Sequence, residues 1–120
     1  MDSTRQQKYA RLIQKEISDV FQHDGYNYYG KAFVTITMVR VSPDLGIARV
    51  YLSIFNVKDS KAVLEMIEKH NWEIRKKLGA KIRHQARIIP ELKFFLDDSL
   101  DYADKIDKLL NETKHTPDKE

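Results

Sequence analysis

The sequence predicts an α+β fold in which helices pack on one face of a three-stranded sheet. Three observations indicate this class. Apolar residues recur at helical spacing near the start, alternate with polar residues over 33–55, and return to helical spacing from about residue 60. The expected order is helix, strand, strand, helix, helix, strand, helix. A chain of 120 residues supplies one hydrophobic core, so we expect a single domain.

The first helix is predicted over about residues 4–23. Ser3 or Thr4 can cap it, because each is followed three residues later by a glutamine that can bond back to the cap. The next segment, HDGYNYYGK, contains two glycines and three tyrosines and is predicted to be a loop. The apolar stripe of the helix comprises Tyr9, Leu12, Ile13, Ile17, Val20 and Phe21.

Two strands are predicted over residues 33–41 and 47–55, where β-branched and aromatic residues alternate with polar ones. The turn between them, SPDLG, contains Pro43, which sets φ, and Gly46, which tolerates a positive φ. A short turn between two alternating runs indicates an antiparallel hairpin with one buried face. The residues predicted to face the core are Val34, Ile36, Met38, Ala48, Val50, Leu52 and Ile54.

Helical spacing resumes at about Ser60, with Asp59 or Ser60 as the N-cap, and is predicted to last until Pro90 stops it. The segment KHNWE in the middle has low helix propensity, so a break is expected between Lys69 and Trp72. The second part is predicted to be helical from residue 75 to residue 87. Its apolar stripe, with that of the first part, comprises Val63, Leu64, Ile67, Ile74, Leu78, Ile82 and Ala86.

The end of the chain is predicted to contain a third strand, ELKFFLDD (91–98), and a last helix, LDYADKIDKLL (100–110). Asp98 or Ser99 can cap this helix. We therefore expect a single domain over 1–112 and a loose polar tail over 113–120.

The charges are polarised along the chain, although the net charge is only +3. Residues 73–90 contain six Lys or Arg and one Glu, whereas residues 97–107 contain five Asp and one Lys. A basic segment followed by an acidic one indicates a partner on the basic side. No cysteine is present, which excludes disulfides and thiol catalysis. No apolar run approaches the roughly 20 residues that span a bilayer, so we expect no membrane association.

The predicted helix around residues 75–87 carries its cations on the side opposite its apolar stripe. No acid follows Glu73 on this side, whereas an ordinary solvated face mixes both signs of charge. This favours contacts with a polyanion, while a plain solvated face and a module that docks an acidic protein remain the alternatives. The candidate RNA-binding residues are Arg75 at the edge of the stripe, Lys76, Lys77, Lys81, Arg83, His84 and Arg87, extended by Lys8, Arg11 and Lys15 of the first helix.

Catalytic patterns are missing from the sequence. The four histidines show no spacing typical of a metal site, and no phosphate-binding loop or nucleophile motif occurs. Asp97 and Asp98 are neighbours on a predicted strand, so they point to opposite faces and cannot share a proton. We therefore expect neither an enzyme nor a cofactor, with a small hydrolase or metal enzyme as the less favoured reading.

Three stretches together resemble ribosome-binding factor A. They are RLIQKEISDVF (11–21), VRVSPDLGIARVYLSIF (39–55) and IRKKLGAKIRHQARIIPELKFFLDDSL (74–100). The resemblance covers roughly residues 4–112, and VSPDLGIARVYLS and RIIPELKFFLDDS are its most specific parts.

The resemblance implies a KH-like domain of the type II arrangement in a cytoplasmic bacterial protein that is not an enzyme. It implies binding to the immature small (30S) ribosomal subunit, assistance to late maturation of 16S rRNA, and a link to growth in the cold. It also implies maturation GTPases as further partners. We expect the protein to act as a monomer.

The family lacks the GxxG loop of ordinary KH domains and carries an Ala-x-Gly kink between its two central helices. Aligned on IRKKLG, this interhelical kink falls at His70, Asn71 and Trp72, so the sequence departs from the family pattern there. Asn71 can break a helix by bonding to nearby backbone or by adopting a left-handed conformation. Trp72 in place of the glycine has no explanation at the level of sequence.

Overall fold

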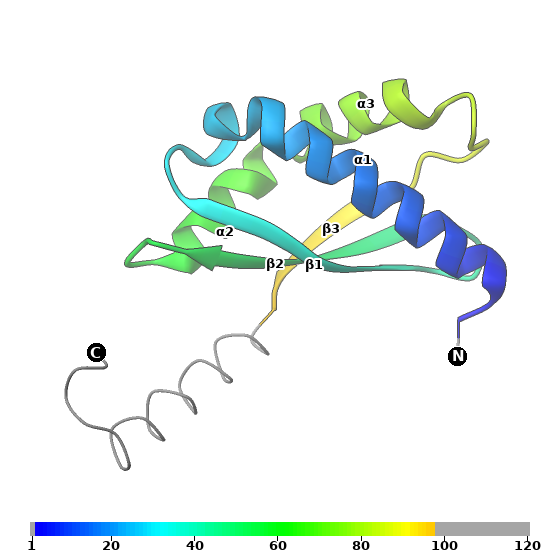
Figure 1. Cartoon of the computed structure of the whole chain (residues 1–120), viewed down its shortest axis with the longest axis horizontal. Helices are drawn as coiled ribbons and strands as arrows, with labels where there is room; N and C mark the ends of the chain where they lie inside the picture. The colour runs from blue at the N-terminus through cyan, green and yellow to red at the C-terminus, as the bar shows by residue number, and fades with distance from the viewer. Residues whose placement is uncertain (1, 98–120) are drawn as a thin grey trace, which may run out of the picture.

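The computed structural model describes residues 2–97. Its elements are α1 (Thr4–Tyr29), β1 (Phe33–Val41), β2 (Ile47–Phe55), α2 (Ser60–Lys69), α3 (Asn71–Ile82) and β3 (Glu91–Leu96). Figure 1 shows the helices together on one side of the sheet, which confirms the predicted class. The predicted last helix and polar tail lie outside the described residues.

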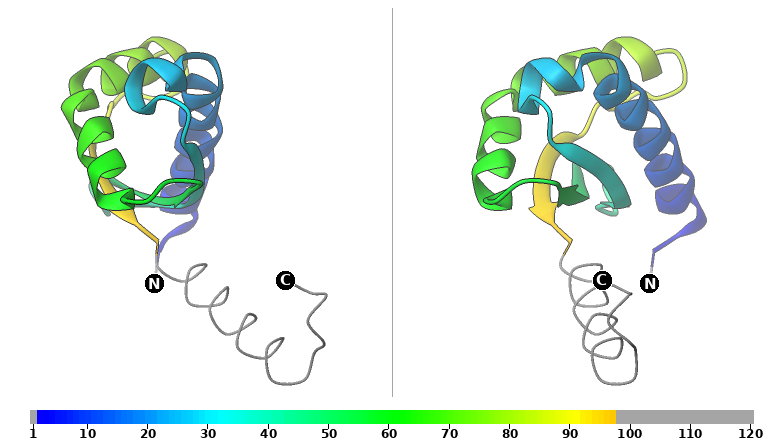
Figure 2. Two further views of the ribbon diagram at one scale, coloured as in Figure 1. Left: turned by 90° about the vertical axis from the view of Figure 1, so that its left-hand side faces the viewer. Right: turned by 60° about the vertical axis from the view of Figure 1, so that its left-hand side comes forward.

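The three strands of the described part form one sheet in the order β1-β2-β3. β1 pairs with β2 antiparallel, and β2 pairs with β3 parallel, so α2 and α3 form the crossover between the parallel strands. α1 packs over β1 and against α3, while α2 packs against β3, as both views in Figure 2 show. This is the KH-like arrangement of type II that the resemblance implies.

α1 is longer than predicted, because it continues from residue 23 through the expected loop to Tyr29. Its start is the predicted capping box between Ser3 and Gln6. Its last turns are held by tertiary packing: Tyr28 is buried, and the Tyr29 ring lies edge-on to Phe21 with centroids 5.6 Å apart. Packing of these rings outweighs the poor helix propensity of the local sequence.

A β-bulge in β1 overturns one predicted core position. The register with β2 shifts between Ile36 and Met38, so Thr37 is an extra residue on this strand. Beyond the bulge the side-chain alternation is inverted: Met38 is exposed, and Val39 and Val41 are buried instead. The inward set predicted for β2 is confirmed, since each of its members is buried.

The break between α2 and α3 lies at His70, within the predicted interval. It needs no left-handed residue, because His70 has a φ of −102°. The Asn71 amide donates to the Leu92 carbonyl and to the Glu68 carboxylate, each at 3.0 Å. These side-chain bonds anchor the break to β3, so a glycine is not required here.

α3 is shorter than predicted: it ends at Ile82, and residues 83–90 form a turn and an extended segment that leads to β3. Pro90 therefore does not stop this helix. The chain leaves the helix early because it must cross back to the sheet edge and enter β3 beside β2. As a consequence Arg83, His84 and Arg87 lie outside the helix. β3 itself ends at Leu96, two residues before the predicted end.

Candidate nucleic-acid interface

Arg75 is bonded to backbone within the domain. Its Nε donates to the Pro90 carbonyl at 3.0 Å and its Nη2 donates to the Ile89 carbonyl at 2.8 Å. A guanidinium that bonds two neighbouring carbonyls holds α3 to the segment leading into β3. The structure therefore gives Arg75 a positioning role that its place at the edge of the apolar stripe did not reveal.

Lys77 and Lys81 are paired with acidic residues of the neighbouring helix. Lys77 Nζ lies 3.1 Å from Asp24 of α1 and 3.3 Å from Glu73, and Lys81 Nζ contacts the Asp19 carboxylate. The Tyr28 hydroxyl and then Asp24 raise the pKa of Lys77, and the hydrogen bond with Asp19 raises the pKa of Lys81. No acid follows Glu73 within α3, but α1 supplies Asp19 and Asp24 in space, so these two cations are not free.

The pair between Asp19 and Lys81 should make stability depend on pH. The hydrogen bond from Lys81 holds the pKa of Asp19 below its ordinary value of 3.8. A carboxyl with a lowered folded pKa contributes stability above the unfolded value and loses it as the pH falls through the folded pKa. We expect Asp19→Asn to lower the urea midpoint slightly at neutral pH, with a difference from wild type that disappears in acid. A Lys81→Met background is the control: there, the pH-dependent effect of Asp19→Asn should be smaller, because of its two ion-pair partners only His23 remains beside Asp19.

The remaining predicted cations are exposed, and within residues 2–97 Lys8, Arg11, Lys15, Arg83 and Arg87 have no ion-pair partner. His84 is also exposed, in the turn that follows α3. These side chains are free to meet phosphate.

A groove of about 610 Å³, here called the basic groove, brings cations from two distant parts of the chain together. Arg5 and Lys8 of α1 line it together with Arg87, and the described residues that line it include no acid. Sequence reasoning missed Arg5, although it lies one turn before Lys8 on the same helix. The full lining is Arg5, Lys8, Tyr9, Leu45, Gln85, Ala86, Arg87 and Ile88.

A second groove, here called the kink groove, lies at the start of α3 and is lined by Trp72, Arg75, Lys76, Gly79 and Ile89. The Trp72 side chain is 71% exposed, and Lys76 Nζ lies 5.2 Å from the centre of its ring. This contact is a cation–π interaction. An added Cβ on Gly79 would lie 3.5 Å from Ile89, so this glycine sits where α3 packs on the segment leading into β3.

The segment 88–90 separates the two grooves and is held from both sides. Ile88 lines the basic groove, and Ile89 lines the kink groove. The Tyr9 hydroxyl donates to the Ile88 carbonyl, while Arg75 binds the next two carbonyls. The two grooves therefore have a fixed spacing.

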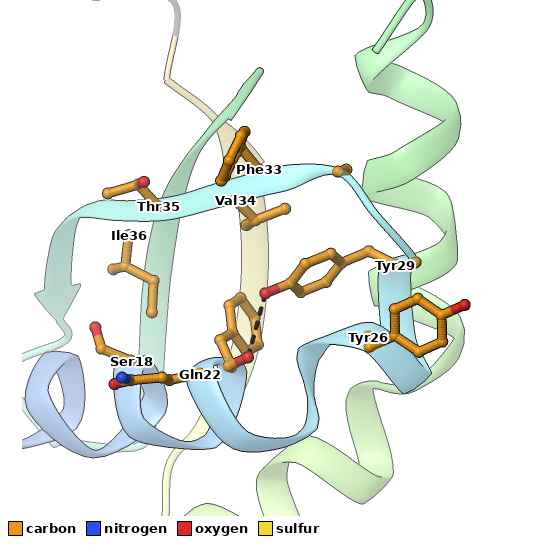
Figure 3. A pocket seen from close by; sticks show the side chains of 11 residues that line it. Ser18, Gln22, Tyr26, Tyr29, Phe33, Val34, Thr35 and Ile36 are labelled. Atoms are coloured by element: carbon orange, nitrogen blue, oxygen red, sulfur yellow. Dashed lines mark hydrogen bonds between the residues drawn. The ribbon is translucent and has the colours of Figure 1, made fainter. Parts of the chain in front are cut away.

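A third cavity lies between the end of α1 and β1 and contains no cation (Figure 3). Tyr26, Tyr29 and Phe33 line it, and the Tyr29 hydroxyl donates to the Phe21 carbonyl at 3.3 Å, the dashed line in Figure 3. Because phosphate needs positive partners, we place no nucleic-acid backbone in this cavity.

No group of three or more histidine and acidic side chains in residues 2–97 is arranged to hold a metal ion. Within the same part of the chain, no helix is long and apolar enough to cross a membrane.

A family model and a relative of known family match this chain over most of its length. The family model described as ribosome-binding factor A matches residues 5–110. The ribosome-binding factor A of Cytophaga hutchinsonii is 50% identical over 111 residues, which cover 92% of this chain and 84% of that protein.

Two structural comparisons agree on the fold. The crystal structure of ribosome-binding factor A from Thermus thermophilus matches with a TM-score of 0.62 at 16% identity, covering 76% of this chain and 94% of that one. A homology model of the Thermus thermophilus factor, fitted into a cryo-EM map of its complex with 30S, matches with a TM-score of 0.56 at 19% identity, covering 82% and 97%. The chain belongs to the ribosome-binding factor A family.

Proposed function

We propose that this protein is a non-enzymatic assembly factor that binds the immature small ribosomal subunit and assists the late maturation of 16S rRNA. The family supports the assignment, as does the fitting of a relative into a 30S complex. The single observation that carries it is the basic groove, where Arg5, Lys8 and Arg87 converge without an acid among the described lining.

The basic groove supplies phosphate contacts. Such contacts set the position and orientation of a protein on RNA but do not read sequence. Folded rRNA can supply specificity through its shape and its unpaired bases. The kink groove could also bind such a base. The exposed Trp72 ring offers a stacking surface, and Lys76, which lies over one part of that ring, supplies a charge for the adjoining phosphate.

Lys77 and Lys81 take a different part in this proposal. Their ion pairs with Asp24 and Asp19 hold α1 against α3, and so fix Lys8 on α1 relative to Arg87 after α3. They support the basic surface without contacting phosphate. The maturation GTPases that the resemblance implies are proposed as further partners on the same particle, with this protein acting in the cytoplasm as a monomer.

Sedimentation of a cell lysate through a sucrose gradient tests the proposed function. The protein should appear in the small-subunit fractions, and a position at the top of the gradient would overturn the proposal. Mild ribonuclease treatment before the gradient should release it. Association with an intact partner protein after ribonuclease digestion would instead identify a module that docks an acidic protein.

The salt dependence of binding should report the number of phosphate contacts. Each neutralised phosphate contributes roughly 0.7 to 0.9 to the slope of log K against log salt. The three contacts from Arg5, Lys8 and Arg87 should therefore contribute about −2 to −3 to the slope for purified small subunits. Arg87→Gln should reduce the magnitude of this slope by about 1, whereas the matched control Lys61→Gln at the start of α2 should leave it unchanged. A flat response in the wild-type protein would exclude phosphate as the main partner.

A further inference from the structure

The outer face of the sheet is the side opposite the helices. Along each strand the inward residues are buried, and their neighbours point the other way. Figure 1 shows α1, α2 and α3 on the inner side, and no helix of the described residues covers the outer side. The groups on this face are arranged in rows across the three strands.

The first row consists of three cations. Arg40 on β1 is the register partner of Arg49 on β2, and Arg49 is the register partner of Lys93 on β3. Adjacent strands are about 4.8 Å apart, so three positive charges lie side by side across the sheet. Like charges directly opposite each other destabilise a sheet. Within residues 2–97, Arg40 of this row forms an exposed ion pair with Asp2, in which Nη2 lies 3.4 Å from the carboxylate.

The next row along the strands is apolar and aromatic. Met38, Tyr51 and Phe95 are register partners, and the Tyr51 and Phe95 rings stack with centroids 5.4 Å apart and an angle of 26° between their planes. A polar row follows, in which Thr37 donates to the Asp97 carboxylate and Ser53 is buried, and beyond it Phe33 pairs with Phe55 and is 66% exposed. Large exposed apolar groups gathered on one face indicate an interaction surface rather than ordinary solvated sheet.

The cationic row adjoins the basic groove through the hairpin. Leu45 in the β1–β2 turn lines the basic groove, and Arg40 with Arg49 is the last outward-facing pair before that turn. Figure 1 shows this turn beside the start of α1, at the same end of the molecule. The basic groove and the cationic row therefore lie at the same end of the molecule, where the exposed Glu91 of β3 adjoins the row.

We propose that the outer sheet face binds single-stranded RNA, with phosphates on Arg40, Arg49 and Lys93 and bases stacked on Tyr51 and Phe95. A row of cations beside a row of aromatic rings is a combination that single-stranded nucleic acid recognises. Residues two apart on a strand are about 6.6 Å apart, which is close to the spacing of successive nucleotides in an extended strand. The inference rests on the proposed function, because it assigns unpaired rRNA to a second surface of the same factor.

Binding of a labelled, unstructured oligouridylate to the full chain tests this inference by fluorescence anisotropy. Arg49→Gln with Lys93→Gln should weaken binding at least tenfold. The control Lys58→Gln with Lys61→Gln removes the same charge at and just before the start of α2, away from the cationic row, and should change binding less than twofold. Phe95→Leu keeps apolar bulk but removes the ring, and should weaken binding by roughly fivefold or more, as loss of one stacked base requires.

Each other outcome counts against the inference. Equal losses in the sheet and control variants would show a general charge effect, and full binding by Phe95→Leu would exclude base stacking. Failure of the wild-type chain to bind the oligomer, together with amine–carboxyl cross-links from Lys93 to residues 97–107, would assign this face to the chain's own acidic segment. After any of these outcomes, sedimentation of the protein with small subunits would still support the proposed function. If the protein does not sediment with small subunits, the proposed function is overturned, whether or not the protein binds the oligomer.

Discussion

Reversing two charges of the basic groove, Lys8→Glu with Arg87→Glu, should weaken binding to small subunits by on the order of 100-fold. Two phosphate contacts are lost, and two repulsions replace them. Both side chains are exposed and unpaired within the described part of the chain, so the fold should be unaffected. Cosedimentation with purified subunits gives the affinity, and circular dichroism checks the fold.

The control for this variant is Lys58→Glu with Lys61→Glu. It has the same net charge but changes exposed residues at and just before the start of α2, outside the lining of the basic groove. Its affinity should stay close to that of the wild type after allowance for overall charge. Wild-type binding by Lys8→Glu with Arg87→Glu would remove the basic groove from the interface.

The same reversal at Lys77 and Lys81 is a poorer test of binding. A glutamate at residue 77 would face Asp24 and Glu73, and one at residue 81 would face Asp19. Such a variant repels α1 from α3, so a loss of cosedimentation would report damage to the fold. The sequence alone placed these lysines among the candidate RNA-binding residues, and their ion pairs show why reversing their charge does not test binding.

Removal of the Arg75 side chain should have the largest effect on stability among the surface positions discussed. Arg75→Ala leaves the Ile89 and Pro90 carbonyls without their charged donor, and we expect the free energy of unfolding to fall by about 2 kcal/mol. Release of the segment 88–90 should also weaken binding to small subunits, because Arg87 and Trp72 lose their fixed spacing. Urea denaturation followed by Trp72 fluorescence measures the first effect, and cosedimentation measures the second.

Arg75→Lys separates a positioning role from a phosphate contact. Lysine keeps the charge but lacks the planar group that reaches both carbonyls, so this variant should lose much of the stability as well. If Arg75→Lys is as stable as wild type while Arg75→Ala loses only binding, Arg75 contacts phosphate directly, as its charge alone suggests.

Local periodicity predicted the elements whose pattern is set by near neighbours. The hairpin strands have the predicted bounds, and the break at His70 lies where helix propensity is weakest. The β-bulge at Thr37 was not predictable, because one extra residue changes pairing with β2 without changing composition. The end of α1 was missed for a related reason: a glycine and three tyrosines are typical of a loop, and only the fold shows that Tyr28 and Tyr29 pack against the core.

For the candidate interface, the sequence by itself determined which residues carry charge and that the positive ones gather in residues 73–90. Only the tertiary structure decided which of those charges are free. Asp19 and Asp24 lie far from α3 in the sequence and yet neutralise two of its lysines, and Arg75 is used by backbone carbonyls. Arg5 and Lys8 join Arg87 from the other end of the chain. The physical reason is that charges interact through space over a few ångströms, and only folding determines which distant residues come that close.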